Sequence, residues 1–189
     1  MNNYTQTMRS LAALLTVSVA VTVLAQTPPA GGIAAPATAK AVFAGGCFWC
    51  VESDFDKVLG VLSTTSGYTG GRTFNPTYQQ VSSNNTGHAE VVEIVLDPAK
   101  VSYEQLVEHF WRTMDPTTKD QQLCDRSSPC RSAIFAVNAA QLKVAQVSKA
   151  ALEKSKPFKE PVVTEVLLAS TFYPPEDYYQ DYYKKNPVR

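Results

Sequence analysis

Short apolar runs separated by polar turns dominate the chain after its first 38 residues. Runs of four to eight apolar and β-branched residues that end at Gly, Asp or Pro are typical of strands. The run at 89–96 is apolar on both faces, so we expect it to be a central strand. The segments that predict strands are 41–44, 61–68, 89–96, 133–137 and 162–168.

Helical spacing predicts three helices between these strands. The first follows Gly45-Gly46, and we expect Phe48, Val51, Phe55, Val58 and Leu59 to share its buried face. The other two are predicted over 102–114, where Ser102 is a suitable N-cap, and over 139–154. This alternation predicts an α+β fold with helices on a mixed sheet.

Two polar segments break the pattern. The stretch 115–131 contains two prolines and reads as a long loop, and long loops in compact domains are often functional. The tail 171–189 is rich in tyrosine, and we expect it to be irregular with one helical turn near 176–183. A further helical turn is expected at Tyr78, inside the polar stretch 73–87.

The first residues have a different character. Arg9 precedes the apolar stretch 11–25, which is short for a membrane span and ends in small residues. This predicts a signal peptide over 1–25, with an uncleaved membrane anchor as the alternative. Residues 26–38 are rich in Pro, Ala and Gly and predict a linker, followed by one domain over 39–189. We therefore expect export to a periplasmic or extracellular location, without stable membrane insertion after cleavage.

Composition narrows the function classes. The 189 residues carry a formal net charge of zero, and 44% of them are hydrophobic. These values allow a sizeable core and argue against a basic surface for nucleic acid. An exported protein meets an oxidising compartment, where its four cysteines can pair.

Cys47 is the strongest candidate for chemistry. It follows a predicted strand and a Gly-Gly turn, which places it in the first turn of a predicted helix. The unpaired N–H groups and the dipole of a helix N-terminus stabilise a thiolate, so we expect a lowered pKa and a reactive nucleophile. Phe48 and Trp49 add apolar surface that suits a small group such as a methyl. The alternatives are buried structural thiols or zinc ligands, although the spacing of the remaining two cysteines does not match common zinc motifs.

Seven motifs, in this order, resemble the peptide methionine sulfoxide reductase A family over residues 40–187. They are GGCFWC (45–50), GYTGG (67–71), NPTY (75–78), GHAEVVEI (87–94), FW followed by DPTT (110–118), RSAIF (131–135) and YPPEDYYQDY (173–182). The resemblance implies a ferredoxin-like α/β sandwich with a mixed sheet and a long irregular C-terminal segment. It also implies a monomeric enzyme that reduces methionine-S-sulfoxide, free or in oxidised proteins, with a thioredoxin-like reductant and without a cofactor or metal.

The resemblance assigns roles by position. Cys47 matches the nucleophile, Glu90 the acid that protonates the sulfoxide oxygen, and Tyr78 a hydroxyl that binds this oxygen. Asp125 matches a second acidic residue of the site, while Phe48 and Trp49 match the pocket for the substrate methyl. Three positions depart from the family pattern: Cys130 replaces a second active-site tyrosine, Ser127 replaces a glycine, and Tyr179 stands where relatives often have a histidine.

The chemistry is coherent with the residue types. A sulfoxide sulfur becomes electrophilic when its oxygen is protonated, and a carboxyl with a raised pKa can deliver that proton. Glu90 lies in the predicted central apolar strand, where such a shift is expected. Attack leaves Cys47 as a sulfenic acid, which a second thiol converts to a disulfide. We expect this resolving thiol to be Cys50, with Cys130 and Cys124 as alternatives.

Two other function classes fit parts of the pattern. Cys47-x-x-Cys50 at a helix start is the arrangement of dithiol–disulfide oxidoreductases, so a periplasmic enzyme of that kind is the main alternative. A non-catalytic secreted binding module with structural disulfides is the third. Glu90 separates these hypotheses, because disulfide exchange needs no carboxylic acid.

Overall fold

The computed structural model describes residues 37–122 and 125–187. The predicted signal peptide 1–25, most of the predicted linker 26–38 and Cys124 lie outside the described residues. Within the described part, no helix combines the length and the apolar character needed to cross a bilayer.

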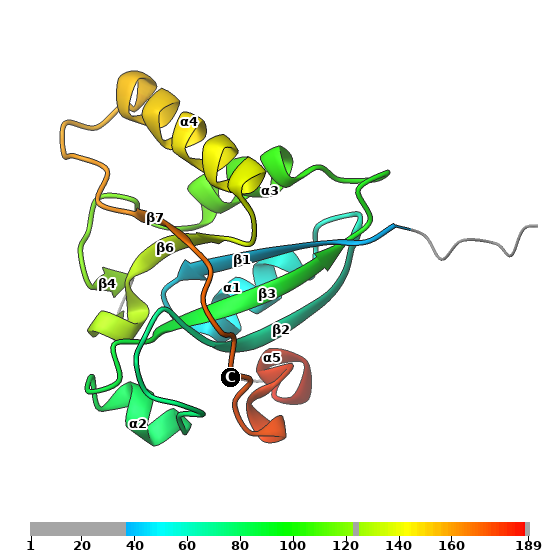
Figure 1. Ribbon diagram of the computed structural model, residues 1–189, viewed down its shortest axis with the longest axis vertical. Coiled ribbons are helices and arrows are strands. Elements are labelled where there is room, and N and C mark those ends of the chain that lie inside the picture. Colours follow the sequence, from blue (N-terminus) through cyan, green and yellow to red (C-terminus); the bar gives the residue numbers. More distant parts are fainter. Residues whose placement is uncertain (1–36, 123–124, 188–189) are drawn as a thin grey trace, which may run out of the picture. The chain divides into compact units, whose positions relative to one another are not determined.

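A five-stranded mixed sheet forms the centre of the domain (Figure 1). Its strands are β1 (Ala39–Gly45), β2 (Val61–Thr69), β3 (Ala89–Leu96), β6 (Ser132–Ala136) and β7 (Glu165–Leu168), in the order β2-β3-β1-β6-β7. The first four pair antiparallel, whereas β7 pairs parallel to β6. The part up to β6 therefore has the strand order of a ferredoxin-like fold, and β7 extends its edge.

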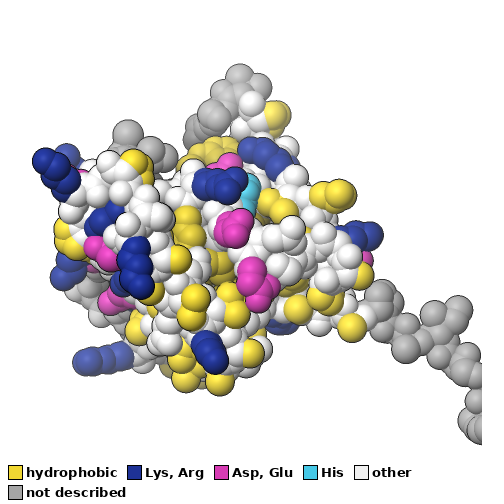
Figure 2. Space-filling view, turned by 90° about the horizontal axis from the view of Figure 1, so that it is seen from above, with side chains coloured by type: hydrophobic (Ala, Val, Ile, Leu, Met, Phe, Trp, Pro, Cys, Tyr) yellow, Lys and Arg dark blue, Asp and Glu magenta, His cyan; other side chains and the backbone are white. Residues whose placement is uncertain are grey.

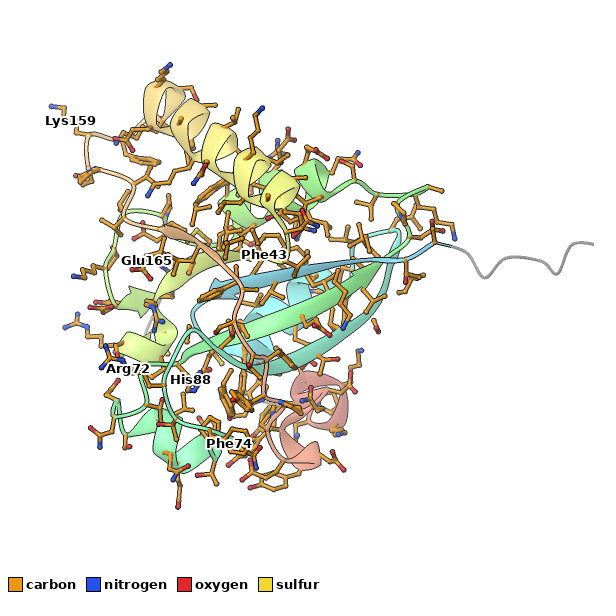
Figure 3. The ribbon with its side chains drawn as sticks, viewed as in Figure 1. Phe43, Arg72, Phe74, His88, Lys159 and Glu165 are labelled. Carbon is orange, nitrogen blue, oxygen red and sulfur yellow. The ribbon has the colours of Figure 1, made fainter. Side chains whose placement is uncertain are left out.

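Three helices share one hydrophobic core with one face of this sheet. They are α1 (Phe48–Phe55), α3 (Tyr103–Thr113) and α4 (Ala139–Ser155). Phe43 of β1, labelled in Figure 3, is fully buried and its ring stacks on Phe55 of α1 and Phe110 of α3, with centroids 5.1 and 5.0 Å away. These contacts position the start of α1 directly beside the end of β1.

The other face of the sheet is covered by the chain that follows β7, not by helices. This segment crosses in front of the sheet in Figure 1. Ala169 and Phe172 pack on a second apolar cluster that includes Ala44 and Phe135. Tyr68 and Tyr173 exchange two backbone hydrogen bonds of 2.9 Å. The segment then forms the 3-10 turn η2 (Asp177–Tyr179) and the short helix α5 (Tyr182–Lys185), which contacts α1.

The polar stretches contain small ordered elements. Thr77 caps α2 (Tyr78–Ser82) through a capping box. The stretch predicted to be a loop holds β4 (Gln121–Gln122), β5 (Asp125–Arg126) and the 3-10 turn η1 (Ser128–Cys130). The pair β4–β5 and η1 lie in the segment that approaches the start of α1.

The α+β prediction is confirmed, and all five predicted strands are present. Two details predicted from the sequence are wrong. Leu59 is 85% exposed, because α1 ends at Phe55 and the chain turns before Gly60. The last strand begins at Glu165 and not at Val162. The face seen in Figure 2 intersperses Lys and Arg with Asp and Glu, in keeping with the net charge of zero.

Candidate active site

A Gly-Gly turn places Cys47 at the start of α1. Gly46 has φ of +96°, and a Cβ atom there would lie 2.4 Å from Cβ of Gln122. Only glycine allows this close approach of two chain segments. Cys47 is the N-cap residue, one position before the first turn in which we expected it, and its carbonyl accepts the N–H groups of Cys50 and Val51 at 3.1 and 3.3 Å. Its thiol therefore lies at the positive end of α1.

Cys47 opens onto a pocket of about 300 Å³, here named the substrate pocket. Trp49, Tyr78 and Glu90 line this pocket with it. The remaining walls come from Ser82, Arg126, Ser127 and Cys130. Residues that are far apart in sequence, on α1, α2, β3 and η1, thus converge around one thiol.

Glu90 is held against the N-terminus of α1. It lies on β3 opposite Tyr68, is 6% exposed, and its Oε2 accepts a hydrogen bond of 3.2 Å from the backbone N–H of Phe48. The carboxyl group therefore lies beside the residue that follows Cys47, inside the pocket that the thiol lines. This is a suitable position for a proton donor to a substrate atom bound next to Cys47.

Tyr78 begins α2 and lines the same pocket. Burial raises the pKa of Tyr78, and the nearby charge of Glu90 raises it further, while a hydrogen bond with the Ser82 side chain lowers it. The hydroxyl therefore stays protonated at neutral pH and can donate a hydrogen bond to an oxygen atom. Ser82, which nothing in the sequence singles out, orients this hydroxyl.

The thiols of Cys47 and Cys50 interact directly. The side-chain hydrogen bond with Cys50 raises the pKa of Cys47, followed by burial and by the charge of Cys50, and these outweigh the backbone N–H of Cys50 that lowers it. The expected lowering of the Cys47 pKa is therefore wrong for the dithiol state. The sequence placed the thiol at a helix N-terminus but did not reveal that a second thiol competes for the same proton.

Cys130 and Asp125 are two residues of the long polar stretch that we expected at the site. Cys130 is buried in η1, lines the substrate pocket, and its Sγ receives a hydrogen bond of 3.2 Å from the Ser127 hydroxyl. Two of the departures from the family pattern, Ser127 and Cys130, therefore meet at the pocket wall. The backbone of Asp125 belongs to β5, whereas its side chain lies outside the described part of the structure.

An aromatic cluster from the C-terminal segment holds Trp49. Its Nε1–H donates to the carbonyl of Tyr179 at 2.8 Å, and its ring stacks on Tyr182 with centroids 4.0 Å apart. The rings of Tyr78 and Tyr179 also contact each other, with centroids 4.5 Å apart and planes tilted by 34°. Phe48 is buried with its ring 5.5 Å from that of Trp49, so it supports the pocket wall and does not line it. The tyrosine-rich composition of the tail was visible in the sequence, but its contact with Trp49 was not.

His88 has a structural role beside the site. Its Nδ1 accepts the N–H of Gly71 at 3.1 Å, and its Nε2 lies 2.8 Å from the carbonyl of Thr73, to which Nε2–H donates. His88 thus fastens the turn after β2 to the start of β3 (Figure 3). No group of three or more His, Cys, Asp or Glu side chains suitable for a metal ion occurs within residues 37–122 and 125–187.

Residues 39–189 match the family described as "Peptide methionine sulfoxide reductase". The chain belongs to this family. It is 54% identical over 146 residues to the peptide methionine sulfoxide reductase MsrA of Listeria innocua, covering 77% of this chain and 82% of that protein. It is 51% identical over 149 residues to MsrA of Bacillus licheniformis, covering 79% and 82%.

Solved structures of the family have the same fold. Reduced Mxr1 from Saccharomyces cerevisiae superposes with a TM-score of 0.73 at 28% identity, covering 80% of this chain and 87% of that one. Methionine sulfoxide reductase A of Corynebacterium diphtheriae gives a TM-score of 0.72 at 31% identity, with coverage of 82% and 78%. The chain is therefore a peptide methionine sulfoxide reductase that uses thiol chemistry.

Proposed function

We propose that the chain reduces the S epimer of methionine sulfoxide, free or in proteins, with Cys47 as the nucleophile and Glu90 as the proton donor. The observation that carries this proposal is the hydrogen bond between Glu90 and the N–H of Phe48 at the N-terminus of α1. Glu90 lines the same pocket as Cys47. The epimer preference rests on membership of the family.

The substrate methyl packs against Trp49, and the sulfoxide oxygen lies between Glu90 and Tyr78. Glu90 protonates the oxygen, which makes the sulfur electrophilic, and Cys47 attacks it. The oxygen and the thiol proton end on Cys47 as a sulfenic acid, and methionine leaves as the thioether. The net reaction converts one thiol and one sulfoxide into one sulfenic acid and one thioether. No net proton is consumed, so Glu90 is protonated again at the end of the step.

Cys50 then resolves the sulfenic acid. Its thiol attacks the Cys47 sulfur, water leaves, and a Cys47–Cys50 disulfide forms. The side-chain interaction with Cys50 that raises the pKa of Cys47 supports this assignment, since both residues lie at the start of α1. Cys130 is the alternative within the described residues because it lines the same pocket as Cys47. Peptide mapping after one turnover without reductant distinguishes a Cys47–Cys50 link from a Cys47–Cys130 or Cys47–Cys124 link.

A thioredoxin-like protein reduces this disulfide. The support comes from yeast Mxr1, whose structure was solved in complex with Trx2. We also propose, from residues 1–25, that the chain is exported after cleavage of a signal peptide and meets its reductant outside the cytoplasm. N-terminal sequencing of the protein from fractionated cells tests this proposal. An uncleaved N-terminus would contradict the cleavage.

The two epimers of dabsyl-methionine sulfoxide provide the test of the reaction. We expect consumption of the S epimer, with dithiothreitol as reductant, while the R epimer remains. Chiral chromatography that finds equal loss of both epimers contradicts the stereochemical proposal. Loss of neither epimer, in a preparation whose thiols are reduced, contradicts the reaction itself.

A further inference from the structure

Cys50 faces a different pocket from Cys47. This second space, the Cys50 pocket, has a volume of about 320 Å³ and lies between α1 and the end of α3. Cys50 lines it, and Cys47 does not; the reverse holds for the substrate pocket. Among its walls are Asp54 of α1, Arg112 of α3 and Met114. The two cysteines are therefore neighbours at the start of α1, but each lines its own pocket.

Reduction of a disulfide has a directional requirement. A thiolate attacks a disulfide sulfur along the line of the S–S bond, from the side opposite the leaving sulfur. If Cys50 is attacked, Cys47 is the leaving group and the attacking sulfur must approach Cys50 from the side away from Cys47. The hydroxyl of Tyr183 on α5 lies 3.4 Å from the Cys50 Sγ and restricts access to this sulfur from its own side. The Cys50 pocket provides the approach between α1 and α3.

We propose that the Cys50 pocket is the docking site of the thioredoxin-like reductant, whose thiolate attacks Cys50 and not Cys47. This inference rests on the proposed Cys47–Cys50 disulfide and reductant class. The reductant's thiolate forms a bond to the Cys50 sulfur, and the S–S electron pair leaves on Cys47 as a thiolate. The second thiol of the reductant then attacks the mixed disulfide, releases Cys50 as a thiolate that takes up a proton, and leaves the reductant oxidised.

The leaving group favours this direction of attack. The Cys47 thiolate forms at the N-cap of α1, where the N–H of Cys50 and the helix dipole stabilise negative charge. A more stable leaving thiolate makes the attacked bond easier to break. The side-chain interaction with Cys50, which is the largest cause that raises the pKa of Cys47 in the dithiol state, is absent at this moment because Cys50 is bonded to the reductant, whereas burial continues to raise this pKa.

The rim of the Cys50 pocket offers contacts that a protein can use. Met114 contributes a partly exposed apolar side chain, and Arg112 an exposed cation. Asp54 forms an ion pair of 3.5 Å with Lys57, whereas within the described residues no carboxylate forms an ion pair with Arg112. Arg112 is therefore available to a carboxylate on the surface of the reductant. Substrate and reductant then use separate entrances, and product in the substrate pocket does not obstruct the reductant.

The first experiment traps the mixed disulfide. The full chain is oxidised by one equivalent of methionine sulfoxide and mixed with a thioredoxin whose second active-site cysteine is replaced by serine. We expect the trapped thioredoxin on Cys50, identified by peptide mapping. A dominant thioredoxin–Cys47 link overturns the proposal. If mapping before the addition finds no Cys47–Cys50 disulfide, the resolving step in the proposed function fails, and the docking inference fails with it.

The second experiment tests the surface. We compare the ratio of the thioredoxin-driven to the dithiothreitol-driven rate in Arg112→Glu with that in Arg72→Glu, which makes the same charge change at an exposed arginine after β2 (Figure 3). Division by the dithiothreitol-driven rate corrects for any effect of the substitution on the sulfoxide-reduction step. We expect the ratio to fall about five- to tenfold at low salt for Arg112→Glu, with a smaller loss at high salt, as for a contact between charges. An equal ratio in the two variants, in a preparation that forms the Cys47–Cys50 disulfide, overturns the docking site alone.

Discussion

The carboxylate of Glu90 and the backbone N–H of Phe48 are joined by a hydrogen bond of 3.2 Å. Phe48 follows Cys47 directly, so this one contact sets the distance between the proton donor on β3 and the nucleophile at the start of α1. The same N–H belongs to the first turn of α1, where helical N–H groups have no partner within the helix. Glu90 therefore both caps this end of the helix and remains in reach of a bound sulfoxide.

Replacement of Glu90 tests the proton donor. Gln can still accept the N–H of Phe48, so the geometry is retained, but it cannot donate the acid proton. We expect Glu90→Gln to slow the chemical step by roughly 10²–10⁴-fold, measured as the single-turnover rate of methionine formation. Glu93→Gln is the matched control on the same strand, because Glu93 forms a partly exposed ion pair with Lys40. A rate near that of the wild type in Glu90→Gln would favour a disulfide oxidoreductase.

Replacement of Cys47 tests the nucleophile. We expect Cys47→Ser to abolish sulfoxide reduction, since a hydroxyl cannot take up the sulfoxide oxygen as a thiol does. Serine is a favoured N-cap residue, so α1 and the fold should be retained. Methionine formation measures the first effect, and circular dichroism with thermal unfolding measures the second. Activity in a folded Cys47→Ser protein would rule out this nucleophile.

The pKa of Cys47 should depend on Cys50. The Cys50 side chain is the largest cause that raises the Cys47 pKa, so Cys50→Ala should lower it. A lower pKa means a larger thiolate fraction at neutral pH, and we expect faster alkylation of Cys47 by iodoacetamide. The alkylation rate, measured as a function of pH, should begin to increase at a lower pH in Cys50→Ala than in the wild type. Peptide mapping identifies the alkylated cysteine. An unchanged profile would show that the two thiols do not share a proton.

Glu52 should make stability depend on pH. It is 3% exposed on α1, its Oε1 has no hydrogen-bond partner, and burial raises its pKa. A carboxyl whose pKa is higher in the folded state favours folding when protonated and opposes it once ionised, so its cost appears as pH rises through the unfolded value of about 4.3. We expect Glu52→Gln to raise the free energy of unfolding at neutral pH by on the order of 1 kcal/mol.

Urea unfolding of Glu52→Gln and wild type at two pH values provides the measurement. The difference should shrink near pH 4, where both side chains are uncharged. Asp97→Asn is a control at a site where the carboxylate is partly exposed and pairs with Lys100 at 3.5 Å. A Glu52→Gln difference that is the same at both pH values would show that ionisation of this carboxyl does not govern the effect.

The sequence was most informative where the determinants are local. Alternation and apolar runs located the strands, and the Gly-Gly turn with its following apolar face located Cys47 to within one residue of its place at the start of α1. Leu59 was misplaced because the helical spacing of apolar residues continues past Phe55, where α1 ends and the chain turns before Gly60.

The remaining features depend on contacts between distant segments. The carbonyl of Tyr179 binds Trp49 across 130 positions, and no periodicity in the tail indicates this partner. The pKa of Cys47 was predicted with the wrong sign because it depends on the orientation of the Cys50 thiol, which a spacing of three residues does not determine. The position of Glu90 could be inferred from its strand, but its bond to the N–H of Phe48 required the fold.

The contact of α5 and η2 with the first turn of α1 has a consequence during synthesis. Trp49 and Cys50 are synthesised well before Tyr179 and Tyr183, which bind them. Contacts between segments so far apart form late in folding, since a long loop must close first. A nascent chain therefore exposes its dithiol before it has the aromatic residues that hold Trp49 in place, and its reactive sulfur atoms are least protected before residues 179–183 have been synthesised.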